Sequence, residues 1–261
     1  MSKLPKENKF VDLSDYGRAP AVYIANTLKY TSVTSIHVTI GFIISGLLAV
    51  YCILVDLFAW AAFFLILKSI LDAADGELSR VKKQPSYVGR YLDSVADVII
   101  NILIFVAIWS VTESNFLLAF FAFVGVQLQG TLYNYYYVIL RNRFDGDTTS
   151  RVLEDVVPKA MPGESQKHVN ILFFLYRFFY AGFDKVIFEL DPRADQGQIF
   201  PNWLMTLVST FGLGFQLLMI AIFLIFGFKE YIIPFFFAYS FFILIVIGIR
   251  RLFFHHARGL R

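Results

Sequence analysis

Long apolar runs, separated by short polar or charged segments, dominate this chain. A helix needs about 20 mainly apolar residues to cross the roughly 30 Å hydrocarbon core of a bilayer. Six runs come close to that length, at residues 36–56, 58–79, 90–111, 116–140, 203–228 and 231–252. The pattern therefore predicts an all-α integral membrane protein with six transmembrane helices.

Two further segments have a weaker apolar pattern. Residues 10–32 space their apolar positions among polar ones, which predicts an N-terminal juxtamembrane amphipathic helix on the cytoplasmic face. Residues 169–190 contain Arg177, Asp184 and Lys185, so we expect a helix on the membrane or packed inside the protein rather than a seventh span. We therefore divide the chain into a cytoplasmic N-terminal segment (1–35), a six-helix transmembrane domain (36–252) with a cytoplasmic or interfacial insertion at about 142–200, and a basic cytoplasmic tail (253–261).

Composition agrees with a membrane protein. Of the 261 residues, 57% are hydrophobic, 18% aromatic and only 16% charged, whereas soluble domains are about 45–50% apolar and about 25% charged. This excludes a soluble domain, a disordered chain and a disulfide scaffold, since Cys52 is the single cysteine. Residues 1–10 lack the apolar core of a cleavable signal peptide. The charges form no basic stripe, so we expect no nucleic-acid partner.

Basic residues mark alternate connections between the predicted spans. They precede the first span, lie between the second and third, follow the fourth and close the chain. The other connections, near residues 56–57, 112–115 and 227–230, contain a single basic residue, Lys229. The positive-inside rule therefore places both termini in the cytoplasm, at the inner membrane or its equivalent, and an even number of spans fits this pattern.

Four aspartates meet at the cytoplasmic edge of the second and third spans. Asp72 and Asp75 are three residues apart, and Asp93 and Asp97 are four apart, so each pair shares one helix face. The short connection between the two helices predicts antiparallel neighbours whose four carboxylates converge. Clustered carboxylates at membrane depth repel one another and need cations.

The chemistry of these residues favours a pair of divalent cations. Oxygen ligands without His or Cys suit Mg²⁺, Mn²⁺ or Ca²⁺, and two such ions about 3.5–4 Å apart clamp a phosphoryl group during displacement. Gly76 and Gly89 let a large ligand approach the helix backbone, and Arg80 offers a fork of donors to a phosphate. The alternative is that the aspartates only cap helices and pair with nearby basic residues.

These positions resemble the signature of the CDP-alcohol phosphotransferase (CDP-alcohol phosphatidyltransferase) family, Asp-x₂-Asp-Gly-x₂-Ala-Arg-x₈-Gly-x₃-Asp-x₃-Asp. All spacings are intact, and Ser79 stands where the family usually has Ala. Residues 34–39 are similar to the family's entry to the first span, with Ser35 and Ile36 replacing Pro-Asn. The resemblance extends over roughly residues 18–250, and its matching positions are Asp72, Asp75, Gly76, Ser79, Arg80, Gly89, Asp93 and Asp97.

The resemblance implies a phosphatidyltransferase of phospholipid biosynthesis. The donor would be a CDP-linked alcohol, most often CDP-diacylglycerol, and an acceptor hydroxyl would attack its β-phosphorus and release CMP. Two Mg²⁺ or Mn²⁺ ions would be held by Asp72, Asp75 and Asp93, with Asp97 contributing and acting as general base. The CMP moiety would be bound by Gly76, Ser79, Arg80 and Gly89. The family also implies a homodimer with a cytoplasmic active site.

Two other functions stay open at this point. An intramembrane prenyltransferase also places aspartates and Mg²⁺ at helix ends, but gives no reason for the glycine and arginine spacing. A non-enzymatic cation transporter would need acidic residues near mid-membrane. The acceptor alcohol is also open. Arg141 and Arg143 could bind a phosphorylated acceptor such as inositol phosphate, or could be ordinary positive-inside anchors. Gln127, Gln129 and Asn134 could contact the acceptor, or could only tie helices together.

Overall fold

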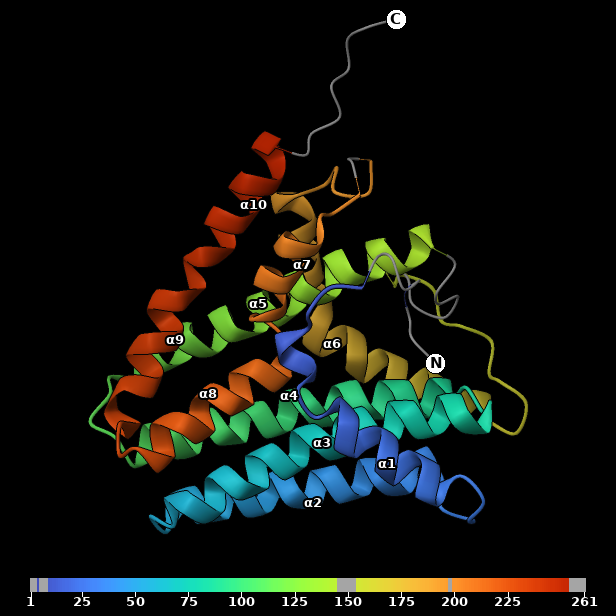
Figure 1. Ribbon diagram of the computed structural model, residues 1–261, viewed down its shortest axis with the longest axis horizontal. Coiled ribbons are helices and arrows are strands. Elements are labelled where there is room, and N and C mark those ends of the chain that lie inside the picture. Colours follow the sequence, from blue (N-terminus) through green and yellow to red (C-terminus); the bar gives the residue numbers. More distant parts are fainter. Residues whose placement is uncertain (1–3, 5–8, 145–153, 197–198, 254–261) are drawn as a thin grey trace, which may run out of the picture.

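The computed structural model describes residue 4 and residues 9–144, 154–196 and 199–253 (Figure 1). All regular structure within these residues is helical, which confirms the predicted fold class. The predicted tail, residues 253–261, lies almost entirely outside the described residues.

Four long helices correspond to the first four predicted spans. They are α2 (Ser35–Leu54), α3 (Phe58–Lys82), α4 (Tyr87–Ser110) and α5 (Phe116–Arg143). The fifth predicted span is α7 (Asn202–Ser209) followed by α8 (Leu213–Ile225), with a bend of 49° between them, and the sixth is α9 (Ile232–Ser240) followed by α10 (Phe242–Phe253). Figure 1 shows α2, α3 and α4 lying side by side, with α9 and α10 rising away from them.

By length and apolarity alone, the described helices include four membrane-span candidates, or five if the bent α7–α8 pair is one span. The predicted six exceed this number because α3 is not a candidate. Every 18-residue window of α3 contains Lys68, Asp72 and Asp75. We treat α3 as a span nevertheless, because its 25 residues reach about 37 Å at about 1.5 Å per residue and it packs along α2 in the core of the bundle.

Helix α6 (Gln166–Leu190) belongs to the predicted insertion and is not among the span candidates, in line with the expectation of no seventh span there. It packs against α4 and α5. Its contact with α4 is an aromatic cluster in which Phe173 and Tyr176 lie against Tyr91 at ring-centroid distances of 5.5 and 5.2 Å. The insertion therefore adds a wall to the bundle beside α4.

The predicted amphipathic N-terminal helix is present but shorter than residues 10–32. It consists of a 3₁₀ turn, η2 (Leu13–Asp15), and α1 (Arg18–Leu28). The side chain of Asp12 caps the turn by accepting from the Ser14 N–H at 3.1 Å, and Gly17 separates the turn from α1. Helix α1 packs small residues, Ala21 and Ala25, against the cytoplasm-predicted end of α3.

Candidate active site

The turn between α3 and α4 is fixed by local hydrogen bonds. Lys83 adopts a left-handed conformation (φ 54°) that ends α3, and the Ser79 hydroxyl donates to the Gln84 carbonyl at 2.8 Å. Ser86 caps α4 by accepting from the Gly89 N–H at 2.7 Å. The turn therefore starts α4 in a defined register, which orients Asp93 and Asp97.

Three of the four predicted aspartates converge. One carboxylate oxygen each from Asp72, Asp75 and Asp93 lies within 4.8 Å of the other two. Thr39 on α2 donates its hydroxyl to Asp75 at 2.8 Å, whereas Asp93 Oδ1 is buried with no hydrogen-bond partner among the described residues. An orphaned carboxylate oxygen in an all-carboxylate donor set fits a hard divalent cation such as Mg²⁺ or Mn²⁺.

The fourth aspartate has a different partner. Asp97 is outside the three-acid group and accepts from Lys68 Nζ at 2.6 Å. The Lys68 side chain is fully buried, and its ammonium lies 4.9 Å from the centre of the Phe42 ring. Lys68 was not singled out from the sequence. The available signal was a lone lysine in an apolar run, one helical turn before Asp72.

A cavity of about 420 Å³ opens beside the aspartates. Its lining comes from the N-terminal segment and from α3, α4, α5, α6 and α8, and includes all four aspartates together with Gly76 and Arg80. Ser79 and Gly89 are not among its lining residues. Their assignment to the CMP pocket stays a prediction, and the contacts that the structure gives them are those of the α3–α4 turn.

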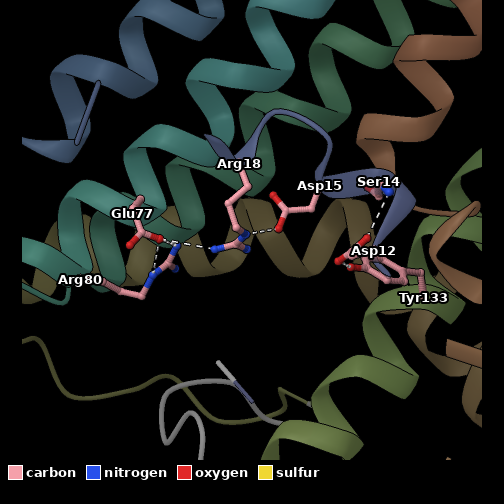
Figure 2. Close-up of polar contacts among 7 residues, drawn as sticks. All are labelled: Asp12, Ser14, Asp15, Arg18, Glu77, Arg80 and Tyr133. Atoms are coloured by element: carbon pink, nitrogen blue, oxygen red, sulfur yellow. Dashed lines mark hydrogen bonds and ion pairs between the residues drawn. The ribbon is translucent and has the colours of Figure 1, made fainter. Parts of the chain in front are cut away.

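Ion pairs join several residues of the cavity lining; we call the part of the lining formed by Asp12, Asp15, Arg18 and Arg80 the charged mouth. Arg80 donates to Glu77 at 2.7 Å, and Arg18 donates to the same carboxylate oxygen at 3.5 Å and also pairs with Asp15. Figure 2 shows the guanidinium groups of Arg18 and Arg80 both directed at the Glu77 carboxylate. The N-terminal segment thus adds a second arginine near Arg80, the residue predicted to bind phosphate.

A second contact fixes the same segment to α5. Tyr133 donates its hydroxyl to Asp12 at 2.6 Å, and the Ser14 N–H donates to the other oxygen of that carboxylate (Figure 2). Burial raises the pKa of Asp12, and these hydrogen bonds act in the opposite direction. Asp12 is therefore a half-buried anchor of the segment that lies at the cavity mouth.

The candidate acceptor residues fall into two groups. Arg141, Gln127 and Asn134 line the cavity. Gln129 instead donates to Ser240 at 3.2 Å, and Arg143 donates to the Asp195 carbonyl at 2.5 Å. Helix α6 contributes further lining residues that sequence reasoning did not find, since nothing in the local pattern of the insertion marks them: Tyr176, Tyr180 and Asp184.

The family model described as CDP-alcohol phosphatidyltransferase matches residues 23–151, about half of the chain, and this stretch contains all eight signature positions. The match is narrower than the predicted 18–250. No curated protein matches the chain.

The chain belongs to the CDP-alcohol phosphatidyltransferase family, as the signature predicted. The family transfers a phosphoryl-alcohol group from a CDP-alcohol, so the protein is a transferase of this kind. Its apolar helices make it an integral membrane enzyme.

Proposed function

We propose that the protein transfers a phosphatidyl group from CDP-diacylglycerol to an acceptor alcohol, with release of CMP, in phospholipid biosynthesis. The observation that carries the proposal is the convergence of Asp72, Asp75 and Asp93, with Asp97 beside them, on a cavity of about 420 Å³. This volume lies in the range of about 300–1,000 Å³ that is usual for small-molecule sites, so the head group of a CDP-lipid would bind there while its acyl chains remain in the bilayer.

Asp72, Asp75 and Asp93 would hold the divalent cations, two Mg²⁺ or Mn²⁺ ions, with Asp97 as a further ligand. Bound there, the cations would neutralise charge that develops on the phosphoryl oxygens. Thr39 fixes the Asp75 carboxylate through its hydrogen bond of 2.8 Å, so part of the donor set is oriented by α2 before any ligand enters.

Asp97 would act as general base. It accepts the proton of the acceptor hydroxyl while that oxygen forms a bond to the β-phosphorus, and the bond from this phosphorus to the bridging oxygen breaks. The bridging oxygen leaves as part of CMP. Lys68, which lies 2.6 Å from Asp97, orients this carboxylate and stabilises its ionised form until the acceptor binds.

The donor's phosphates and cytidine would lie toward the mouth. Arg80 would donate to a phosphate, held in position by Glu77 at 2.7 Å, and the nearby Gly76 leaves the helix surface open there. Arg18 pairs with the same Glu77 carboxylate, so its positive charge would lie near the phosphate that Arg80 binds. We assign Ser79 and Gly89 to this subsite only through their signature positions.

The remaining features follow from the family and the charge pattern. We propose a homodimer with both termini and the active site on the cytoplasmic side. Residues 36–252 would form the catalytic domain, residues 1–35 the cytoplasmic N-terminal segment and residues 253–261 a basic tail.

The test measures CMP released from CDP-diacylglycerol by purified protein with a panel of alcohols, with Mg²⁺ or Mn²⁺ and with EDTA. We expect metal-dependent release that falls about 100-fold or more in Asp97→Asn, since a general base contributes about that much. The matched control is Asp56→Asn, because Asp56 lies at the opposite end of the bundle, is 66% exposed and has a positive φ that Asn tolerates.

Each outcome separates the rival functions. Equal CMP release by Asp97→Asn and the native protein would refute the general-base role. Diphosphate release from a prenyl diphosphate would favour the prenyltransferase, and cation flux without turnover of CDP-diacylglycerol would favour the transporter. The family match favours the transferase over both.

A further inference from the structure

One face of α5 lines the inner part of the cavity with polar but uncharged residues. Gln127, Gly130, Thr131 and Asn134 recur at spacings of three or four, so they lie along one helix face. Asn101 on α4, one turn beyond Asp97, lines the same cavity. This face therefore lies deeper along the helices than the charged mouth.

Two of these side chains are buried with unused hydrogen-bonding capacity. Gln127 and Thr131 are each only 7% exposed, and Gln127 Nε2 and Thr131 Oγ1 have no partner among the described residues. Gln216 on α8 differs, because its amide nitrogen donates to the carbonyls of Val126 and Phe211 and to Gln129. A buried polar group without a hydrogen-bond partner is costly. This indicates that a ligand supplies the missing hydrogen-bond partners of Gln127 and Thr131.

Gly130 leaves space at the same place. A Cβ built on Gly130 would meet no atom within 4 Å, although the residue lies between Gln127 and Thr131 on a helix packed into the protein. The open volume above it belongs to the cavity. The unpartnered polar groups of Gln127 and Thr131 therefore lie beside the open space at Gly130.

The arginines that line the cavity either pair with acidic residues or lie farther along α5. Arg18 and Arg80 share Glu77, and Arg90 pairs with Glu154. Arg141 lines the cavity but follows Thr131 by ten residues, which is about 15 Å along a helix. An anionic group on a small ligand bound at Gln127 and Thr131 would find no cation on this part of α5.

We infer that Asn101, Gln127, Gly130 and Thr131 form the acceptor subsite and that the acceptor is a neutral alcohol with several hydroxyl groups. This inference rests on the proposed function. Amide and hydroxyl side chains both donate and accept, which matches hydroxyl groups, and a site built to bind hydroxyls rejects analogues that lack them. Asn101 places the subsite one helical turn from Asp97, where an acceptor hydroxyl would lose its proton.

The experiment compares acceptors in the CMP-release assay with CDP-diacylglycerol. The probes are glycerol and myo-inositol as neutral polyols, glycerol 3-phosphate as an anion, serine as a zwitterion and ethanolamine as a cation. We expect turnover with a neutral polyol. In Gln127→Leu the KM for that polyol should rise about fivefold, the effect of one lost hydrogen bond, while the KM for CDP-diacylglycerol stays unchanged.

Gly130→Ala tests whether the acceptor occupies the open space at Gly130. The added methyl group meets no protein atom, and Ala favours a helix more than Gly, so the variant should fold with a Tm at or above that of the native protein while its KM for the polyol rises. Gly182→Ala on α6 is the matched control, because a Cβ there also meets nothing within 4 Å and the residue does not line the cavity.

The failures are distinguishable. A charged acceptor used in preference to every neutral polyol would overturn the inference and leave the proposed function standing. A change in the KM for CDP-diacylglycerol alone would show that these residues bind the donor, which also overturns it. Absence of CMP release with every alcohol would overturn the proposed function and this inference together.

Discussion

At the scale of single residues, Lys68 is the least expected part of the site. Its ammonium is fully buried, lies 2.6 Å from Asp97 and also interacts electrostatically with Asp72 and Asp93. It supplies a resident positive charge where four acids gather, so it offsets part of their repulsion even without a bound cation. The acids and the lysine together form one electrostatic unit.

Replacing Lys68 by Met should therefore destabilise the cation-free protein. Removing one partner of a buried ion pair costs about 3–5 kcal/mol, and here it also increases the repulsion among the aspartates. Since a bound cation relieves that repulsion, added Mn²⁺ should raise the Tm of Lys68→Met more than that of the native protein. The control is Lys185→Met, because Lys185 is 75% exposed on α6. Equal Mn²⁺-induced shifts in all three proteins would contradict this account.

Asp184 predicts a pH dependence. Burial is the main reason that the pKa of this α6 carboxyl is raised from 3.8 to about 7, and Asp155 adds to the effect. Between pH 3.8 and about pH 7 the folded protein keeps a proton on Asp184 that the unfolded chain has lost. The free energy of unfolding should therefore fall as pH rises through this range. The slope is at most about 1.4 kcal/mol per pH unit for one proton.

The measurement compares the Tm of the native protein and of Asp184→Asn from pH 4 to 8. The Asp184→Asn variant should lack this fall in the free energy of unfolding with pH. Its Tm relative to that of the native protein should therefore increase up to about pH 7 and then level off. A constant difference across the range would show that Asp184 does not titrate there.

The sequence predicts the residues of the signature well and their neighbours poorly. Asp72, Asp75 and Asp93 could be placed together because spacing on two connected helices determines their faces. Lys68 on α3 donates to Asp97, Thr39 on α2 donates to Asp75, and Asp184 on α6 lines the same cavity as these aspartates. Their positions depend on how the helices pack, which local spacing does not encode.

At the scale of elements, the break between α7 and α8 has a packing role. A Cβ on Gly212 would lie 2.3 Å from Ser14 Oγ, and one on Gly214 would lie 1.9 Å from the Ser14 carbonyl oxygen. The Gly214 N–H also donates to the Ser14 hydroxyl at 3.1 Å. These glycines let η2 rest directly on α8, which positions Asp12, Asp15 and Arg18 at the cavity mouth.

Gly214→Ala should consequently displace η2. Backbone atoms of Ser14 cannot move aside cheaply, so we expect a loss of about 1–3 kcal/mol, the usual cost of overpacking, together with a higher KM for the CDP-linked donor. Gly248→Ala on α10 is the matched control, because a Cβ there meets nothing within 4 Å. Thermal unfolding and CMP release check both effects, and a Gly214→Ala variant that behaves like the control would show that η2 does not depend on this contact.

The sequence predicts the existence of the elements more reliably than their continuity. Apolar length alone identifies α2, α4 and α5 as spans. It does not predict that residues 203–228 bend by 49° near Gly212, where the η2 turn from about 200 residues earlier in the chain packs against the break.

At the scale of the whole molecule, three connections lie together at one end of the bundle. Lys229 lies 3.5 Å from Asp56, and the Glu113 N–H donates to Glu230 at 3.1 Å. The connections α2–α3, α4–α5 and α8–α9 therefore share one end, whereas the α3–α4 turn and the signature aspartates lie toward the other. This is the alternation that the basic residues predict, so we propose that the cavity opens to the cytoplasm.

Single cysteines at the two ends test this orientation. In a Cys52→Ala background, Glu113→Cys and Gln84→Cys each place one thiol at an exposed position, at opposite ends of the bundle. A membrane-impermeant maleimide should label Glu113→Cys on intact cells and Gln84→Cys only after permeabilisation. Because a charged CDP group does not cross a bilayer unaided, the cavity must face the compartment that holds the nucleotide. The reverse labelling pattern would place the cavity outside and contradict both the charge rule and the proposed supply of the donor.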